Sequence, residues 1–466
     1  MIDRLQPYPD YKDSGSAWIG RVPGHWDTRP AFGAFAPNHE RNFGMKEKTI
    51  LSLSYGRIIL KPIDKLHGLV PESFETYQIV NPGDVVIRTT DLQNDRTSLR
   101  VGMVRNRGII TSAYLALKSK AGVDSNYGYQ FLNVWDLSKA IYYYGSGLRQ
   151  NLDFSHFKRM PIALPPPDEQ AAIVKYLDWA NGRLERAIRA KRKIIALLNE
   201  QKQAIIHRAV TRGLDPGVKL KPSGSRWFPE VPNNWEVVTL RRMIVSAVDG
   251  PHFSPRYYDT GIPFLSARNI KPDRWSLGDV KYISKRDYAE FSKRVRPEVG
   301  DVLYSKGGTT GIARVVDLSY PFQVWVHIAV LKLQKRRIDP EYLAYCLNSP
   351  RCYEQSQLFT RGATNQDLGL GRMKDIELPV PPTLDEQTAI VNFVDTACSS
   401  YINAIERLER EIVMLREYRT RLVTDVVTGK LDVREAAKDL PDEAVEPEVV
   451  PDAEELSESE PEEVEA

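Results

Sequence analysis

The chain has 466 residues and a formal net charge of only +3, but that average combines two regions of opposite sign. Residues 441–466 contain twelve acidic side chains and no Lys or Arg, which leaves +15 on residues 1–440. No run of about 18 apolar residues occurs and the N-terminus lacks the apolar stretch of a signal peptide, so we exclude a membrane protein and expect a cytoplasmic one. The basic body has the charge of a nucleic-acid-binding protein, and the acidic end is predicted to be disordered.

The cysteine count excludes a disulfide-held protein. Cys346, Cys352 and Cys398 are odd in number and lack the CxxC spacing of a metal site, so we expect reduced, structural thiols. The seven histidines form no HxxxH or His/Cys cluster, and no metal or other cofactor is predicted.

The sequence repeats itself. Ser14–Trp18 with Val22-Pro23 and Trp26 recurs, 209 residues later, as Ser223–Trp227 with Val231-Pro232 and Trp235. Asn81–Val86 is matched by Pro297–Val302, Pro167–Val174 by Leu384–Val391, and Val210-Thr211 by Val427-Thr428. Because these anchors agree while the segments between them differ, we infer an internal duplication that carries two different surfaces.

Before each long helical segment lies a region with short β-rich runs, such as 84–87, 108–117, 301–304 and 323–333. We therefore predict an α/β (α+β) fold with two globular domains, residues 1–165 and 217–382. Residues 166–216 are expected to form a first spacer helix and connector, residues 383–436 a second spacer helix, and residues 437–466 the acidic tail.

Each repeat ends in a predicted helix of roughly 43–45 residues. Thr383 and Glu386 have the spacing of a capping box, and Gly213 and Gly429 stand where a helix would end. In a heptad register, position a holds Leu177, Leu184, Lys191, Leu198 and Ile205, and position d holds Ile173, Ala180, Ala187, Ile194 and Gln201; the same register continues in the second helix. A stripe of this kind also arises when a helix packs on its own domain.

The helices are nevertheless too long, at about 65 Å each, for a domain of this size to cover. Residues 168–212 carry a charge of +5 and residues 385–428 a charge of −3, so the two helices attract each other weakly. We therefore expect an antiparallel coiled coil that relates the two halves by a pseudo-twofold.

Catalytic motifs are absent from the sequence. Leu164–Asp168 lacks the polar and aromatic residues that flank the prolines of an amino-methyltransferase loop, and Gly145–Gly147 and Gly369–Gly371 lack the third glycine of a dinucleotide loop. Asp273, Asp279 and Lys281 resemble a nuclease triplet only superficially. No catalytic residue is predicted.

The loops that follow the β-rich runs contain groups that can read DNA. Arg and Lys donate to guanine or phosphate, and Asn and Gln pair with adenine. The candidate DNA-binding residues are Arg88, Thr89, Asn94, Arg96, Arg149, Gln150, Arg268, Asn269, Ser305, Lys306, Thr309, Arg361, Asn365 and Gln366. The alternative for any one of them is an ordinary solvated loop residue.

The chain resembles the specificity subunits of type I restriction-modification systems over nearly its whole length. The resemblance is carried by the two Ser-Gly-x-x-Trp openings, the Gly-Asp strands, and the proline-rich helix entries that end in Glu-Gln-x-x-Ile at Ile173 and Ile390. The acidic tail is not part of it. The tail is expected to be an inert solvating extension, to contact a basic surface of a partner, or to compete with DNA.

The resemblance implies two target recognition domains, each reading one half of a bipartite, asymmetric site in double-stranded DNA, with the helices as a spacer. It also implies that two methyltransferase subunits and two restriction subunits assemble on this chain and perform the chemistry. Two other hypotheses remain at this point: a stand-alone DNA enzyme, and a purely structural coiled-coil scaffold. The target sequence and gap length do not follow from the sequence.

Overall fold

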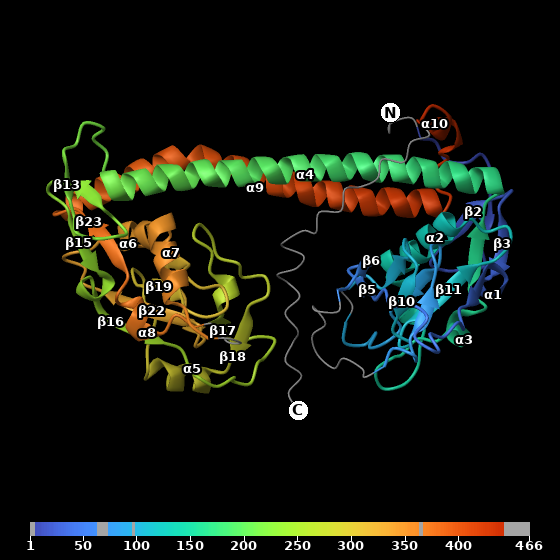
Figure 1. Ribbon diagram of the computed structural model, residues 1–466, viewed down its shortest axis with the longest axis horizontal. Coiled ribbons are helices and arrows are strands. Elements are labelled where there is room, and N and C mark those ends of the chain that lie inside the picture. Colours follow the sequence, from blue (N-terminus) through green and yellow to red (C-terminus); the bar gives the residue numbers. More distant parts are fainter. Residues whose placement is uncertain (1–4, 63–72, 96–97, 363–366, 442–466) are drawn as a thin grey trace. The chain divides into compact units, whose positions relative to one another are not determined.

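The computed structural model describes residues 5–62, 73–95, 98–362 and 367–441, so Arg96, Asn365, Gln366 and residues 442–466 of the predicted acidic tail lie outside the described part. The chain divides into two compact units: unit 1 contains residues 1–191 and 410–466, and unit 2 contains residues 192–409. Two long helices pass through both, α4 (Pro167–Arg212) and α9 (Leu384–Val427) (Figure 1). Both predicted helices are therefore present.

The remaining elements of unit 1 are mostly short strands, together with several short helices of which α2 is the longest. They are β1 (Tyr11–Asp13), β2 (Arg21–Pro23), β3 (Asp27–Pro30), α1 (Ala31–Ala34), β4 (Phe35–Pro37), β5 (Leu51–Ser54), β6 (Arg57–Leu60), β7 (Gln78–Val80), β8 (Val85–Ile87), β9 (Val101–Met103), β10 (Gly108–Ile110), β11 (Leu115–Ser119), α2 (Ser125–Leu137), η3 (Ala140–Tyr143), α3 (Phe154–Phe157), β12 (Pro161–Leu164) and α10 (Arg434–Lys438).

Unit 2 has the same kind of content. Its elements are β13 (Leu220–Pro222), β14 (Glu230–Pro232), β15 (Glu236–Thr239), η4 (Leu240–Arg242), β16 (Ile244–Asp249), β17 (Ile262–Leu265), η5 (Ala267–Asn269), β18 (Lys281–Ile283), α5 (Lys285–Ser292), β19 (Val302–Ser305), β20 (Ala313–Val315), β21 (Gln323–Val324), β22 (Ile328–Leu333), α6 (Pro340–Leu347), α7 (Pro350–Phe359), α8 (Leu370–Met373) and β23 (Glu377–Val380).

Each unit is built on a four-stranded antiparallel sheet of the same order. In unit 1 the order is β4-β11-β8-β9, and in unit 2 it is β16-β22-β19-β20. The duplication read from the sequence is thus a duplication of sheet topology. The predicted run 108–117 differs in detail, because residues 111–114 form a turn that separates β10 from β11, and the two strands join different sheets.

The repeated Glu-Gln pair anchors each long helix to its own unit. Gln170 donates to the carbonyl of Gly122 at 3.0 Å and accepts from the backbone of Asp124 at 2.8 Å. Gln387 makes the corresponding bonds, donating to the carbonyl of Arg337 at 3.0 Å and accepting from the backbone of Asp339 at 2.8 Å. Because both glutamines are buried and fully bonded, the first turn of each helix is fixed to the globular part.

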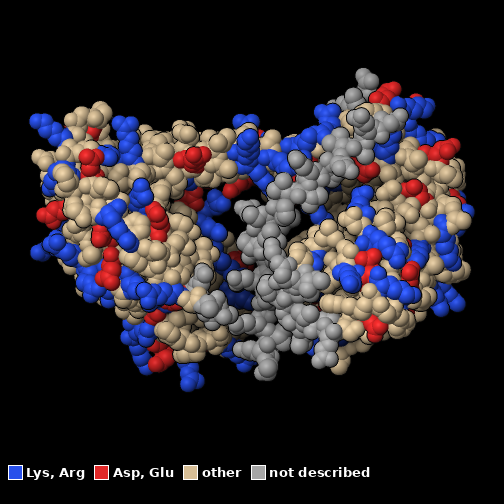
Figure 2. Space-filling model, viewed as in Figure 1, with Lys and Arg blue, Asp and Glu red and all other residues tan. Residues whose placement is uncertain are grey.

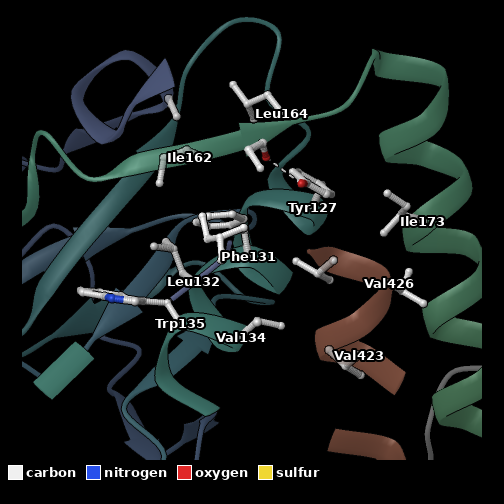
Figure 3. Packing of buried hydrophobic residues seen from close by; sticks show 14 of the residues in the cluster. Tyr127, Phe131, Leu132, Val134, Trp135, Ile162, Leu164, Ile173, Val423 and Val426 are labelled. Atoms are coloured by element: carbon white, nitrogen blue, oxygen red, sulfur yellow. Dashed lines mark hydrogen bonds between the residues drawn. The ribbon is translucent and has the colours of Figure 1, made fainter. Parts of the chain in front are cut away.

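Segments of both long helices contribute to each core. In unit 1, Ile173 of α4 and Val423 and Val426 of α9 belong to the same buried cluster as Phe131 and Trp135 (Figure 3). In unit 2, the cluster combines Ile206 and Val210 of α4 with Ile390 and Val394 of α9.

The first turn of α9 is capped by Thr383, which accepts from the backbone of Glu386 at 3.2 Å. Gly213 and Gly429 follow the two helix ends with φ values of 71° and 76°.

Ion pairs join the two helix segments within unit 1. Lys191 lies 2.5 Å from Glu411 and Arg419 lies 3.3 Å from Glu185. Since the α4 number falls while the α9 number rises, these segments run in opposite directions. In this region, charged side chains of α4 therefore pair with side chains of opposite charge on α9.

The predicted heptad register is wrong in the second part of α4. Ile194, assigned to position d, is 45% exposed and Gln201 is also exposed, whereas Lys202 and Ile206 are buried. The buried positions instead recur with the 3.6-residue period of a straight helix, which moves about 20° per heptad away from a strict seven-residue pattern. The stripe therefore follows the helix surface rather than a continuous heptad seam.

Candidate nucleic-acid interface

In each unit, the loop that follows one central strand of the main sheet is hydrogen-bonded to a segment that lies far away in the sequence. In unit 1, the loop after β8 is joined to the segment around Asn151: Leu152 donates to the carbonyl of Thr89 at 2.8 Å, and the side chain of Asn151 accepts from the backbone of Asp91 at 3.1 Å. In unit 2, the loop after β19 is joined to the segment around Asp367, because Leu368 donates to the carbonyl of Lys306 at 2.8 Å. The duplication thus preserves the pairing of these loops.

Three of the predicted residues in unit 1 are engaged inside the protein. The buried Thr89 donates from its hydroxyl to the carbonyl of Ala113 at 2.9 Å. The Gln150 amide donates to the carbonyls of Tyr142 and Tyr144 at 2.7 and 2.9 Å. Arg88 is half-buried and lies 3.2 Å from Asp95. These side chains shape the loops, and their contact with DNA stays a prediction.

The exposed groups of unit 1 lie at the tips of the two loops. Asn94 is exposed and donates to the side chain of Asp91 at 2.8 Å. Arg149 is exposed beside Leu148, which is 97% exposed. The turn that carries them is closed by two backbone bonds between Ser146 and Asn151, of 3.0 and 2.9 Å. A fixed turn with a cation and an apolar side chain at its tip is suited to contact with a groove of DNA.

Unit 2 also uses several predicted residues internally. Asn269 is buried and donates to the carbonyl of Ser276 at 2.8 Å, and the Ser305 hydroxyl is buried and accepts from the backbone of Ile312 at 2.9 Å. Lys306 is buried as well, between Asp367 at 2.6 Å and Asp249 at 3.4 Å. We conclude that these three side chains hold the loops in place.

The ion network around Asp249 gives this part of unit 2 a defined charge state. Burial opposes ionisation of Asp249, but a hydrogen bond from Arg294 and the charge of Lys306 outweigh it, so the pKa of that carboxyl lies below its ordinary value. Burial, aided by the charge of Lys306, also lowers the pKa of His327. The network is therefore an ionised carboxylate between cations, next to an imidazole that favours its neutral form.

Three predicted residues of unit 2 remain open to solvent: Arg268, Thr309 and Arg361. Arg268 is largely exposed and its nearest carboxylate oxygen, on Asp279, lies 3.8 Å away. A pair this exposed is weak, so the guanidinium can exchange it for phosphate or a guanine edge. Arg361 lies on the loop that pairs with Gly307 through Asp367.

Unit 2 presents a further surface that we did not predict. Phe253 is 61% exposed, Arg256 lies 5.5 Å from the ring centre of Tyr258, and Lys281 lies 5.4 Å from that of Tyr257. Aromatic and basic side chains that alternate in this way are typical of nucleic-acid surfaces. The alternation is visible in the sequence from 252 to 258 and could have been found there.

Unit 1 has a groove beside its loop pair. The groove has a volume of about 460 Å³, and its lining includes His39, Arg41, Thr89, Asp153 and Lys158. Figure 2 shows Lys and Arg side chains spread over the visible face of both units, with Asp and Glu side chains among them. Asp273, one member of the nuclease-like triplet, pairs with Lys202 of α4 at 3.1 Å.

Comparison with known proteins finds similarity to one family. Residues 232–412 match the model of the type I restriction modification DNA specificity domain. The chain is thus similar to the specificity subunits of type I restriction-modification systems. The type I restriction enzyme MjaVIII specificity subunit of Methanocaldococcus jannaschii is 23% identical to it over 363 residues, which cover 76% of this chain and 81% of the relative.

Two further similarities extend along most of the chain. The putative MjaX specificity subunit of the same organism is 22% identical over 456 residues, or 93% of this chain and the whole relative. A chain from a solved structure described as the basis of complex assembly and conformational transition of the type I restriction-modification system has a TM-score of 0.54 at 15% identity. That match covers 87% of this chain and 98% of the other. It indicates a shared fold.

The structure places limits on other readings of the chain. Within the described ranges, no helix is both long and apolar enough to cross a membrane. The same ranges contain no cluster of three or more His, Cys, Asp or Glu that could hold a metal ion. Cys346, Cys352 and Cys398 are free and buried, and burial raises the pKa of the Cys352 thiol to about 12.

Proposed function

We propose that this chain is the non-catalytic DNA-recognition subunit of a type I restriction-modification complex, in which each unit reads one half of a bipartite, asymmetric site. The observation that carries the proposal is the repeated loop pair: in two units of equal sheet order, the loop after the equivalent strand is bonded to a distant segment, but the exposed side chains differ. Two sheets of the same topology that carry loops with different exposed side chains are suited to reading two different DNA sequences. The two target recognition domains are residues 1–165 and 217–382.

The exposed polar side chains of both units are of the types that bind base edges and phosphates of DNA. Unit 1 offers Asn94 and Arg149, and unit 2 offers Arg268, Thr309 and Arg361. An arginine can bind guanine through two hydrogen bonds, and an asparagine can do the same with adenine. The excess of +15 on residues 1–440 favours association with the phosphate backbone and makes it sensitive to salt.

We further propose that α4 and α9 form an antiparallel pair along their length, which holds the two units at a fixed separation. The ion pairs between Lys191 and Glu411 and between Glu185 and Arg419 support this arrangement. Since the distance between two reading surfaces fixes the spacing of half-sites on a duplex, helix length would set the number of unspecified base pairs.

The chemistry then belongs to partner subunits in the cytoplasm. We propose that two methyltransferase subunits and two restriction subunits assemble on the chain, as the family resemblance implies. The absence of catalytic motifs from the sequence agrees with this division. Copurification with a methyltransferase subunit that carries an Asn/Asp-Pro-Pro-Tyr/Phe loop would support the assembly.

The test is to change one unit at a time. Arg149→Ala and Arg268→Ala should each weaken base preference in one half-site, and in different halves, when the full complex is mapped by sequencing of methylated DNA. Loss of preference in both halves by either variant would contradict the division of labour. Sequence-independent affinity of the wild type would favour a structural scaffold, and methyl transfer by the chain alone would favour a stand-alone enzyme.

A further inference from the structure

Arg100 is a fully buried arginine directly behind the loop after β8. Its Nη1 donates to the carbonyls of Thr90 at 2.8 Å and Arg88 at 3.4 Å. Its Nη2 donates to the carbonyls of Asp91 at 3.1 Å and Asp95 at 2.5 Å. One guanidinium therefore binds four backbone carbonyls of a single loop, and the loop is wrapped around it.

The same side chain reaches the second loop of unit 1. Its Nε donates to the hydroxyl of Tyr142 at 3.2 Å, and its guanidinium carbon lies 5.6 Å from the Tyr142 ring centre. The carbonyl of Tyr142 in turn accepts from the amide of Gln150. Arg100 thus adds a side-chain connection from the loop after β8 to Tyr142, beside the bond that Asn151 makes to Asp91.

Two residues of these loops have backbone conformations that L-amino acids rarely adopt. Asp91 has a φ of 59° and Gln150 a φ of 48°. Such conformations persist only where surrounding contacts enforce them. Asp91 is held by Arg100 at its carbonyl and by Asn151 at its amide, and Gln150 by its bonds to the segment from Tyr142 to Tyr144.

The charge of Arg100 is compensated mainly by carbonyl dipoles. Its nearest carboxylate contact through the side chain is Asp95, whose Oδ2 lies 3.8 Å from Nη2 and also 3.2 Å from Arg88. A planar guanidinium can satisfy five acceptors in fixed directions, whereas the ammonium of a lysine has three donors and no such fork. The site therefore requires arginine rather than positive charge alone.

Unit 2 supports its loop differently. The backbone of Arg88 donates to the carbonyl of Arg100, and at the corresponding place the backbone of Ser305 donates to the carbonyl of Ile312. Ile312 thus occupies the position of Arg100, and the loop of unit 2 is held instead by Lys306 and its two carboxylates. A variant at Arg100 consequently leaves the support of unit 2 untouched.

We propose that Arg100 is a positioning residue for recognition of the half-site read by unit 1: it makes no contact with DNA, but fixes the two loops that do. The proposal rests on the proposed function. It implies that the tips at Asn94 and Arg149 read bases only while the buried guanidinium holds both loops in their strained conformation.

The experiment selects DNA from a library of randomised duplexes with the full chain and the subunits that copurify with it. For Arg100→Lys, we expect discrimination in the half-site affected by Arg149→Ala to fall about tenfold, which corresponds to one lost bidentate base contact. Discrimination in the other half-site should stay within about twofold of the wild type. Unchanged discrimination in both halves would overturn the proposal.

A matched variant separates positioning from stability. Val134→Ala removes fully buried methyl groups from the core of unit 1 without touching either loop, so it should lower the melting temperature but keep discrimination. Equal loss of discrimination by Val134→Ala would show a merely structural role.

If Arg100→Lys does not fold, Tyr142→Phe serves in its place, because it removes one hydrogen bond of Arg100. Tyr142→Phe should lower discrimination a few-fold in the same half-site, and no loss would overturn the proposal. A wild type without half-site preference would instead refute the proposed function itself.

Discussion

The indole nitrogen of Trp26 donates a hydrogen bond of 2.8 Å to a carboxylate oxygen of the buried Glu169. The hydroxyl of Tyr8 and the imidazole of His25 bind the same carboxylate at 2.5 and 2.7 Å. In unit 2, Trp235 and Glu386 repeat the first contact at 2.7 Å. The repeated tryptophans of the sequence are thus partners of the repeated glutamates, and together they fasten the start of each long helix to its unit.

Glu169→Ala should destabilise unit 1 by about 3 kcal/mol, because it leaves the donors of Trp26 and Tyr8 buried without an acceptor. Urea unfolding of the full chain, followed by tryptophan fluorescence, measures this loss. Glu200→Ala, at an exposed position of α4, serves as the control and should stay within about 0.5 kcal/mol of the wild type. Equal effects of the two variants would refute the anchoring role of Glu169.

The long helices and the repeated framework could be predicted, because their signals are local: a sustained apolar stripe, a capping threonine and a terminal glycine each act within a few residues. The heptad register could not be extended along α4, since the pattern of apolar letters alone does not distinguish a period of 3.5 from one of 3.6. Ile194 is apolar and nevertheless exposed for this reason.

The loops after β8 and β19 could be predicted from the sequence, but the exposure of their side chains could not. Lys306 is buried because Asp249 and Asp367 approach it from positions 57 and 61 residues away, and no local pattern shows such partners. Arg100 also escaped prediction: an arginine at the end of a polar loop, directly before β9, looks like a surface cation until the loop is seen around it.

The stability of unit 2 should decrease as the pH falls below the ordinary histidine value of 6.5. Burial and Lys306 lower the pKa of His327 in the folded chain, so below pH 6.5 the unfolded state binds the proton first and gains free energy relative to the folded state. His207 in α4 acts in the same direction. His327→Gln should therefore make the free energy of unfolding depend less on pH between about 7 and 5.

Urea unfolding at several pH values checks this. The exposed His39 of unit 1 provides the matched control, and His39→Gln should leave the pH dependence of unit 2 unchanged. If the free energy of unfolding depends on pH equally in the wild type and in His327→Gln, the contribution assigned to His327 is contradicted.

Removal of residues 442–466 should leave DNA affinity and half-site preference unchanged at fixed salt, as expected of a solvating extension. The truncation must keep Leu440, because that side chain is buried in the core of unit 1 next to α10. Titration of the full-length and shortened complexes with one DNA duplex is the measurement. Tighter binding by the shortened chain would show that the tail competes with DNA, and loss of a copurifying subunit would show that the tail binds a partner.

Insertion of seven residues into both long helices, between Lys191 and Arg192 and between Glu409 and Arg410, should lengthen the gap between half-sites. Seven residues add two turns and about 10.5 Å, while the helix faces turn by only about 20°. At about 34 Å per turn of DNA, the gap should grow by about three base pairs with both half-sites unchanged. Mapping of methylated sites in the variant complex gives the new spacing.

Insertion into α4 alone should abolish recognition, since the apolar stripe of α4 then no longer meets that of α9. A doubly extended chain that keeps the original spacing would show that the helices do not set the gap.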